Sequence, residues 1–157
     1  MTNRFGAAVL ALLLSQVACA QDVGRLIEQN VRSSTSAYKR LADESKASVP
    51  QLWIHVRSQE QLRLVQSNLN WFKALSVEGR KASVRPTQLV DVGPQQSQLR
   101  YFRQADLRQA QLLLAEIRKA IPNVVLTDMS QQYQQASWIE PGHFELWLAP
   151  SVTTIRP

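Results

Sequence analysis

Residues 52–72 read LWIHVRSQEQLRLVQSNLNWF, a strand pattern that runs directly into a helix pattern. Residues 52–56 are mostly aromatic or β-branched, which is typical of a strand. Ser58 has a side chain preferred at a helix N-cap. The apolar residues after it lie three or four apart, as on one face of a helix: Leu62, Val65, Leu69 and Phe72. We therefore predict a strand at 52–56 and a helix from Ser58 to near Gly79, a residue that ends helices well.

The same pattern returns in residues 99–117, which read LRYFRQADLRQAQLLLAEI. They predict a strand at 99–103 and a helix over 107–121. Between the two halves, residues 84–92 read as a strand and Gly93-Pro94 as a turn, and residues 124–127 read as a further strand. The order β-α-β-β-α-β predicts an α+β fold, namely a ferredoxin-like two-layer sandwich with an antiparallel sheet and both helices on one face.

Both ends of the chain differ from this core pattern. Residues 144–148 alternate like an additional C-terminal strand, and residues 151–157 read as a loose tail. Residues 21–50 are polar and predict a weak helix or a stalk, interrupted at Ser33–Ser36 because these side chains compete for backbone hydrogen bonds. We therefore expect a single α+β domain at 51–150.

Residues 1–20 predict a bacterial secretory signal. One basic residue, Arg4, precedes an uncharged apolar run that is too short to span a bilayer. Small residues at Ala18 and Ala20 suit signal peptidase, which predicts cleavage after Ala20 and a periplasmic or secreted protein.

Cys19 is the only cysteine in the chain, and it permits an alternative at the same place. In that alternative Cys19 becomes the lipidated first residue of a lipoprotein anchored to the membrane. Lipoproteins usually carry leucine three residues before the cysteine, and Gln16 stands there instead. Plain cleavage would leave no cysteine for a disulfide, so stability would come from a packed core.

The charge and the motifs narrow the function classes. A net charge of +6 favours anionic partners, and export argues against nucleic acid. The two histidines, His55 and His143, lack a metal-ligand spacing, and the sequence has no G-x-S-x-G motif and no glycine-rich phosphate loop. We therefore predict no metal, no cofactor and no enzymatic activity, with His143 solvated in a turn.

Strand alternation predicts a candidate binding face. If the β-branched residues of the first strand point toward the helices, their neighbours point to the opposite, outer face of the sheet. The same argument applies to the strand at 144–148. The strand at 99–103 is ambiguous, and it adds its residues to the outer face if Leu99 and Tyr101 point inward. The argument then assigns six residues to the outer face: Trp53, His55, Arg57, Arg100, Phe102 and Trp147. Aromatic rings beside arginines suit sugars, peptides or another protein. The alternative is that the N-terminal segment or the 130s loop covers this face and buries the tryptophans.

Residues 52–128 resemble the C-terminal domain of LytR-type cell-envelope proteins and, more loosely, SPOR domains. The resemblance lies in the strand-helix-strand repeat and in Leu99-Arg100-Tyr101-Phe102-Arg103, then Asp106 and Ala110 in a leucine-rich helix. It implies a periplasmic module that binds peptidoglycan glycan strands on a ferredoxin-like sheet. The chain lacks a glycine directly after its first strand, and residues 144–148 have no counterpart in the minimal SPOR fold.

These observations predict an exported, non-enzymatic binding domain of the cell envelope. Its partner would be an envelope protein or peptidoglycan, and it would touch a membrane only through a lipid on Cys19. The alternative is a small periplasmic enzyme or enzyme inhibitor that uses His55 with a nearby carboxylate. A concave pocket that brings His55 near an aspartate or glutamate would favour the alternative, and a flat aromatic sheet would favour binding.

Overall fold

The computed structural model describes residues 23–41, 43 and 48–157. The predicted signal and Cys19 lie outside the described residues. Contacts divide the chain into two units, with the boundary between Arg40 and Leu41. No described helix is both long enough and apolar enough to cross a bilayer.

The described part of the first unit, residues 23–40, is helical with mostly exposed side chains. The interruption predicted at Ser33–Ser36 is wrong, because the helix continues through these residues. Ser33 Oγ donates to Asn30 O and Thr35 Oγ1 donates to Val31 O, so the hydroxyls bond back to carbonyls of their own helix. This back-bonding lets such residues stay inside a helix.

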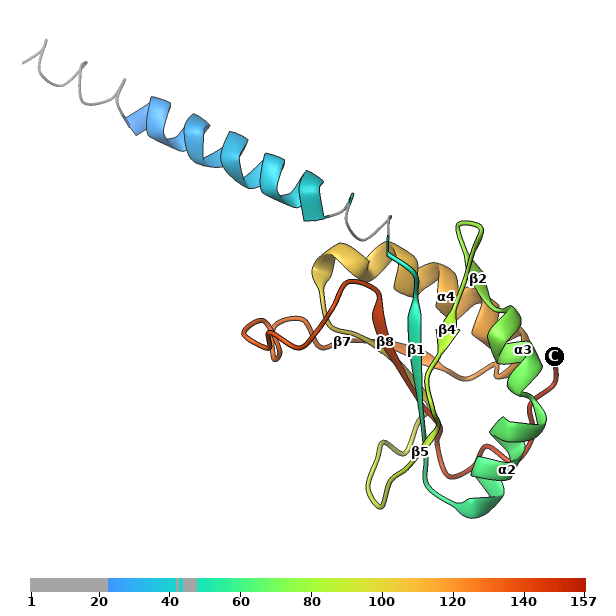
Figure 1. Cartoon of the computed structure of the whole chain (residues 1–157). Coiled ribbons are helices and arrows are strands. Elements are labelled where there is room, and N and C mark those ends of the chain that lie inside the picture. The colour runs from blue at the N-terminus through green and yellow to red at the C-terminus, as the bar shows by residue number, and fades with distance from the viewer. Residues whose placement is uncertain (1–22, 42, 44–47) are drawn as a thin grey trace, which may run out of the picture. The chain divides into compact units, whose positions relative to one another are not determined.

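The second unit is α+β, as predicted, with a mixed sheet and three helices (Figure 1). Its elements in chain order are β1 (Gln51–Val56), α2 (Gln59–Ser67), α3 (Leu69–Ala74), β2 (Ser76–Val77), β3 (Arg80–Lys81), β4 (Ser83–Val84), β5 (Gln88–Leu89), β6 (Gln98–Tyr101), the 3-10 turn η1 (Gln104–Asp106), α4 (Leu107–Ala120), β7 (Val125–Asp128) and β8 (His143–Trp147).

The strands of the main sheet follow the order β4-β1-β8-β6-β7, and β5 also pairs with β1. The predicted antiparallel sheet is wrong, because within the described strands of the main sheet only β6 and β8 pair antiparallel. β1 is parallel to β4, β5 and β8, and β6 is parallel to β7. Each predicted strand-helix-strand unit therefore brings its own two strands side by side in parallel. β8 lies between β1, from the first strand-helix-strand repeat, and β6, from the second (Figure 1).

β8 is central because it completes the core. Phe144 and Leu146 are fully buried, and they pair with Leu52 and Ile54 of β1 on one side. On the other side they pair with residues of β6 whose side chains point the same way. The alternate residues of β8, Glu145 and Trp147, are only partly buried on the other face, which explains the regular alternation at 144–148.

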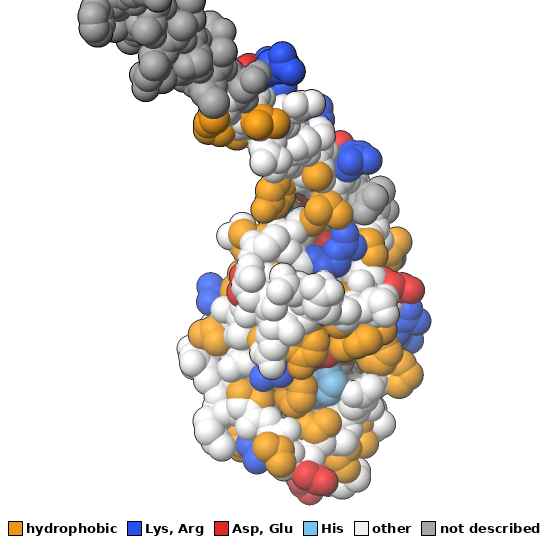
Figure 2. Space-filling view, turned by 90° about the vertical axis from the view of Figure 1, so that its left-hand side faces the viewer, with side chains coloured by type: hydrophobic (Ala, Val, Ile, Leu, Met, Phe, Trp, Pro, Cys, Tyr) orange, Lys and Arg blue, Asp and Glu red, His pale blue; other side chains and the backbone are white. Residues whose placement is uncertain are grey.

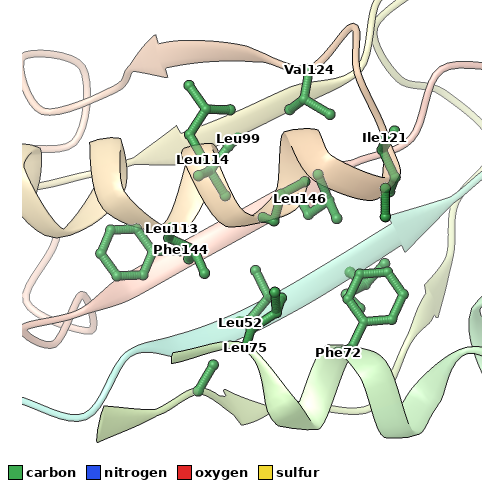
Figure 3. Packing of buried hydrophobic residues seen from close by; sticks show 14 of the residues in the cluster. Leu52, Phe72, Leu75, Leu99, Leu113, Leu114, Ile121, Val124, Phe144 and Leu146 are labelled. Carbon is green, nitrogen blue, oxygen red and sulfur yellow. The ribbon is translucent and has the colours of Figure 1, made fainter. Parts of the chain in front are cut away.

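The core lies between the sheet and the helices. α4 contributes Ala110, Leu113, Leu114 and Ile117, and the other two helices contribute Val65 and Phe72. Figure 3 shows the labelled side chains of α3 and α4 on the same side of the strands, filling the layer between helix and sheet. One face of the sheet is thus covered by helices, and the outer face carries the alternate strand residues.

The first predicted helix divides into two. Ser58 is the N-cap, and its Oγ accepts from Gln61 N, as predicted. Asn68 then ends α2, and its side-chain amide donates to Leu64 O. Gly79 does not end the helix. Glu78 and Gly79 have positive φ values and form the two-residue turn between β2 and β3, the geometry that favours glycine in hairpins.

Two further predictions are corrected. The strand at 84–92 is two short edge strands, β4 and β5, with Pro86 between them. Proline has no N–H for a ladder and is found at such edges. The tail at 151–157 is not loose. Ile155 is buried in the core cluster, and Arg156 N donates to Ala120 O.

Candidate functional site

β1 and β8 are neighbours in the sheet, and their side chains on the outer face form one cluster. The parallel register sets Trp53 opposite Glu145 and His55 opposite Trp147. His143 is the first residue of β8 and points the same way as Glu145, two residues on. Two histidines, two tryptophans and a carboxylate therefore share one patch because of strand alternation alone.

Glu145 is the centre of this cluster. Its Oε2 accepts a hydrogen bond of 2.9 Å from Trp147 Nε1, and its Oε1 lies 3.5 Å from His143 Nε2. His55 Nε2 lies 3.9 Å from Oε2, too far for a hydrogen bond. The Glu145 side chain is only 16% exposed, so the carboxylate is held between groups from two neighbouring strands.

The surroundings favour an ionised Glu145 beside a neutral His55. Burial raises the pKa of Glu145, but the hydrogen bonds from His143 and Trp147 outweigh it, and its pKa lies below the ordinary value. Burial lowers the pKa of His55, and the Arg100 guanidinium adds to that, while Glu145 opposes it. At neutral pH Glu145 is therefore ionised and His55 is neutral.

One side of the cluster is a stack of three groups. The Arg100 guanidinium carbon lies 4.4 Å from the centre of the Trp147 ring. The other neighbour of Trp147 is His55, with ring centres 4.2 Å apart and planes 14° from parallel. Gly93 lies so close to Trp147 that a Cβ there would be 3.2 Å from a ring carbon. Arg57 Nη1 donates to Gly93 O and belongs to this side.

The other side is covered by the 130s loop. Tyr133 packs edge-on against Phe102, and Phe102 packs edge-on against His143, with ring centres 5.2 and 5.1 Å apart. Trp138 also packs edge-on against His143, at 5.7 Å, and is 58% exposed. Trp53 and His143 are stacked with ring centres 5.8 Å apart. The loop thus buries Phe102 and leaves Trp138 standing at the surface.

Between these two sides lies a pocket of about 480 Å³. Nine residues line it: Gln51, Trp53, His55, Arg85, Gln88, Trp138, Glu140, His143 and Glu145. Figure 2 shows histidine atoms at this surface with hydrophobic side chains beside them. A volume of this size lies within the usual range for small-molecule sites.

The rim of the pocket is tied together by polar side chains. Arg85 donates to Gln51 Oε1, and Gln51 Nε2 donates in turn to Glu140 Oε2 at 3.1 Å. The Arg85 guanidinium carbon lies 5.8 Å from the centre of the Trp53 ring. The Arg85 guanidinium and the Glu140 carboxylate thus both lie on the rim, linked by the Gln51 amide.

Three buried nitrogens of the pocket lining have no hydrogen-bond partner among the described residues. They are Trp53 Nε1 and both ring nitrogens of His55. A buried polar atom left unpaired costs about 1–3 kcal/mol, and such atoms in native structures call for an explanation. Trp53 and His55 therefore have hydrogen-bonding capacity that the described protein atoms leave unused.

The structure sorts the six predicted site residues into four groups. Trp53 and His55 line the pocket. Trp147 and Arg100 stand beside it in the stack, half-buried. Arg57 contacts the Gly93 turn and does not line the pocket. Phe102 is only 4% exposed, so its prediction as an exposed binding residue is wrong; the 130s loop covers it.

Several residues of the pocket were not predicted from the sequence. His143 was predicted to be solvated in a turn, but it is buried and begins β8. Its spacing of two from Glu145 was the signal that places it on the outer face. Arg85 and Gln88 reach the pocket because β4 and β5 pair with β1, and Trp138 and Glu140 reach it through the loop before β8. No local sequence pattern marks these four residues.

Among the residues that the structure describes, no group of three or more histidine, cysteine or acidic side chains is arranged to hold a metal ion. Comparison of the chain with protein-family models, curated proteins and solved structures finds no match.

The buried His55 makes stability depend on pH. Its folded-state pKa lies below the ordinary 6.5, so the unfolded chain takes up the proton first as the pH falls. This contribution to stability is present above pH 6.5 and is lost as the pH falls toward the folded-state pKa. The lowered pKa of Glu145 acts in the same direction, but only below its ordinary value of 4.5.

We therefore expect the free energy of unfolding in urea to fall between pH 6.5 and 4.5, and His55→Phe to remove most of that fall. Phenylalanine keeps a flat ring to stack on Trp147 and does not titrate. Glu145, Arg100 and His143, the charged or titratable groups around His55, are unchanged in the variant. If the free energy of unfolding falls equally with pH in the parent and the variant, His55 is not the group that causes the fall.

Proposed function

We propose that this chain is an exported, non-enzymatic binding module of the bacterial cell envelope, and that its pocket binds a glycan of the peptidoglycan type. The observation that carries the proposal is Trp53, a half-buried indole that walls a pocket of about 480 Å³. The predicted signal and the resemblance to LytR-type and SPOR domains support the envelope location. The proposal includes a relation of the α+β domain to the ferredoxin-like sandwich.

A glycan suits this lining better than an apolar ligand. A sugar ring has an apolar face that can lie on an indole and an edge of hydroxyls that need donors and acceptors. The rim offers both in planar side chains, the amides of Gln51 and Gln88, the guanidinium of Arg85 and the carboxylate of Glu140. The concave shape favours a ligand that enters the pocket over the flat surface of an envelope protein.

A second candidate is favoured by one observation, the contact of both histidines with Glu145. A concave pocket in which His55 Nε2 lies 3.9 Å from a carboxylate is the arrangement that supports a small enzyme, since imidazole and carboxylate are the usual general acids and bases. The two candidates differ in what happens to the bound glycan. Recovery of the intact oligosaccharide after long incubation supports binding, and cleaved products in the mass spectrum support the enzyme.

The test of binding uses the chain without residues 1–20. We expect it to sediment with purified peptidoglycan sacculi, and Trp53→Ala to lose that binding while its circular dichroism and thermal midpoint stay close to those of the parent. The reason is that Trp53 supplies the stacking face of the pocket and does not pack against the core cluster. Trp53→Phe should retain part of the binding, because it keeps an aromatic face.

Trp71→Ala is the matched control. Trp71 is also a half-buried tryptophan, but it lies on α3 against the core, away from the pocket lining. Its loss should lower stability and leave the folded protein able to bind. Full sacculus binding by a folded Trp53→Ala protein would overturn the proposal. If the parent chain binds only sacculi that still carry envelope proteins, and not purified sacculi, its partner is a protein.

A further inference from the structure

The pocket lining holds more carboxylates than guanidinium groups, although the chain is positive overall. The chain carries a net charge of +6, yet two carboxylates, Glu140 and Glu145, line the pocket with a single guanidinium, Arg85. Arg85 stays at the rim beside Trp53 and donates to Gln51, so it does not neutralise the floor.

Among the described residues no lysine or arginine forms an ion pair with Glu145. Arg100 lies opposite it on β6, but its guanidinium stacks on Trp147 and donates to Gln98. Among the described residues its ion pairs are with His55 and His143 alone, and both involve long distances of 3.9 and 3.5 Å. A carboxylate can accept about four hydrogen bonds, and Glu145 receives one short bond, from Trp147. Buried carboxylates are normally paired with a cation or fully hydrogen-bonded. The carboxylate therefore has capacity left for a donor that enters the pocket.

Aromatic rings flank the approach to this carboxylate. Trp53 and Trp138 both line the pocket, and the His143 ring packs against each of them. Indole faces attract cations, and carboxylates beside aromatic rings form sites for ammonium groups. The 58% exposure of Trp138 leaves a large apolar surface uncovered, which a bound ligand would cover. His55, more than nine-tenths buried and without a hydrogen-bond partner, lies at the floor of the same pocket.

We propose that the pocket recognises the ammonium group of an amino sugar whose amine is free, with Glu145 as its anchor and Glu140 at the rim. The inference rests on the proposed function and narrows it, from a glycan in general to one that lacks the N-acetyl group at the bound ring. An N-acetyl group has no positive charge for Glu145, and its amide would meet the carboxylate with a single N–H.

The experiment compares two matched oligosaccharides, a tetramer of glucosamine and the same tetramer fully N-acetylated. Both are titrated calorimetrically into the chain without residues 1–20, at a pH where the amine is protonated. We expect the free amine to bind about tenfold more tightly, the scale of one desolvated cation–π and ion contact. We also expect this preference to shrink as salt is added.

Glu145→Gln should bring the two affinities to within about twofold, because the amide is isosteric and uncharged. Since Glu145 is mostly buried, Glu140→Gln serves as a second variant, on an exposed residue, and should reduce the preference in part. Glu116→Gln is the matched control, a partly exposed glutamate of α4 paired with Lys119, and should leave the preference unchanged.

The outcomes separate the two proposals. Equal binding of both tetramers, or tighter binding of the acetylated one, overturns the amine preference and leaves glycan binding standing. No binding of either tetramer, together with no binding to sacculi, overturns both. A preference for the amine that survives Glu145→Gln and Glu140→Gln overturns the assignment of the carboxylates.

Discussion

Leu113→Ala should lower the free energy of unfolding by about 2–5 kcal/mol, the usual cost of emptying a fully buried leucine site. Leu113 has no exposed surface and lies in the layer between α4 and the sheet (Figure 3). Small domains have a total stability of about 5–15 kcal/mol, so the variant should lose a large share of it. Urea denaturation followed by circular dichroism measures the loss.

The neighbouring residue is the control. Leu112 lies on the same helix but is 39% exposed, so Leu112→Ala removes the same atoms with little change in burial. We expect its cost to stay near the 0.5 kcal/mol typical of surface substitutions. Similar losses at the two positions would mean that α4 packs with a different face from the one described.

Gly142→Ala should cost roughly 2–4 kcal/mol, from a left-handed backbone and a steric clash together. Gly142 has a φ of +77°, and a Cβ there would lie 2.8 Å from Ser48 Oγ and 3.1 Å from Val49 O. The serine side chain can turn away, but the carbonyl of Val49 belongs to the backbone. Gly142 also donates its N–H to Asp106 and accepts from Gln51 N, so the clash acts at the start of β8.

Gly79→Ala separates the two causes. Gly79 has nearly the same φ, +80°, and nothing lies within 4 Å of the position its Cβ would take. It should therefore show the conformational cost alone, about 1–2 kcal/mol. The difference between the two variants in urea denaturation measures the clash. Equal costs would show that residues 48 and 49 move aside freely.

Most elements were predictable because their patterns are local. The alternation at 52–56 and 144–148 corresponds to β1 and β8, and the apolar spacing around Leu114 and Ile117 corresponds to α4 with both residues buried. Ser58 caps α2 as its side chain predicted. In each case neighbours along the chain decide the conformation, so a window of a few turns contains the information.

The strand partners were not predictable. Nothing within residues 144–148 states that this strand pairs with β1 and β6 at once, because that outcome depends on which edges the rest of the chain leaves open. The ladder direction was wrong for the same reason. Asn68 also broke the first helix where the apolar spacing continued unchanged, and only its own hydrogen bonds to the preceding turn reveal the break.

For the site too, features set by local pattern were predictable and features set by long-range pairing were not. Strand parity predicted that Trp53, His55, Arg100 and Trp147 share the outer face, and the structure places them there. Parity does not say what covers a face, so Phe102 was assigned wrongly. The pocket itself needs Arg85 from an edge strand and Trp138 from a loop, and both depend on long-range pairing.

The position of β8 also orders events during folding. β1 and β6 precede β8 in the chain, and until β8 is in place each has a free edge where its central partner will sit. Open strand edges pair readily with other chains, and contacts between distant segments form slowly. The partly folded chain is therefore exposed to intermolecular pairing until β8 inserts, and this one strand closes both edges at once.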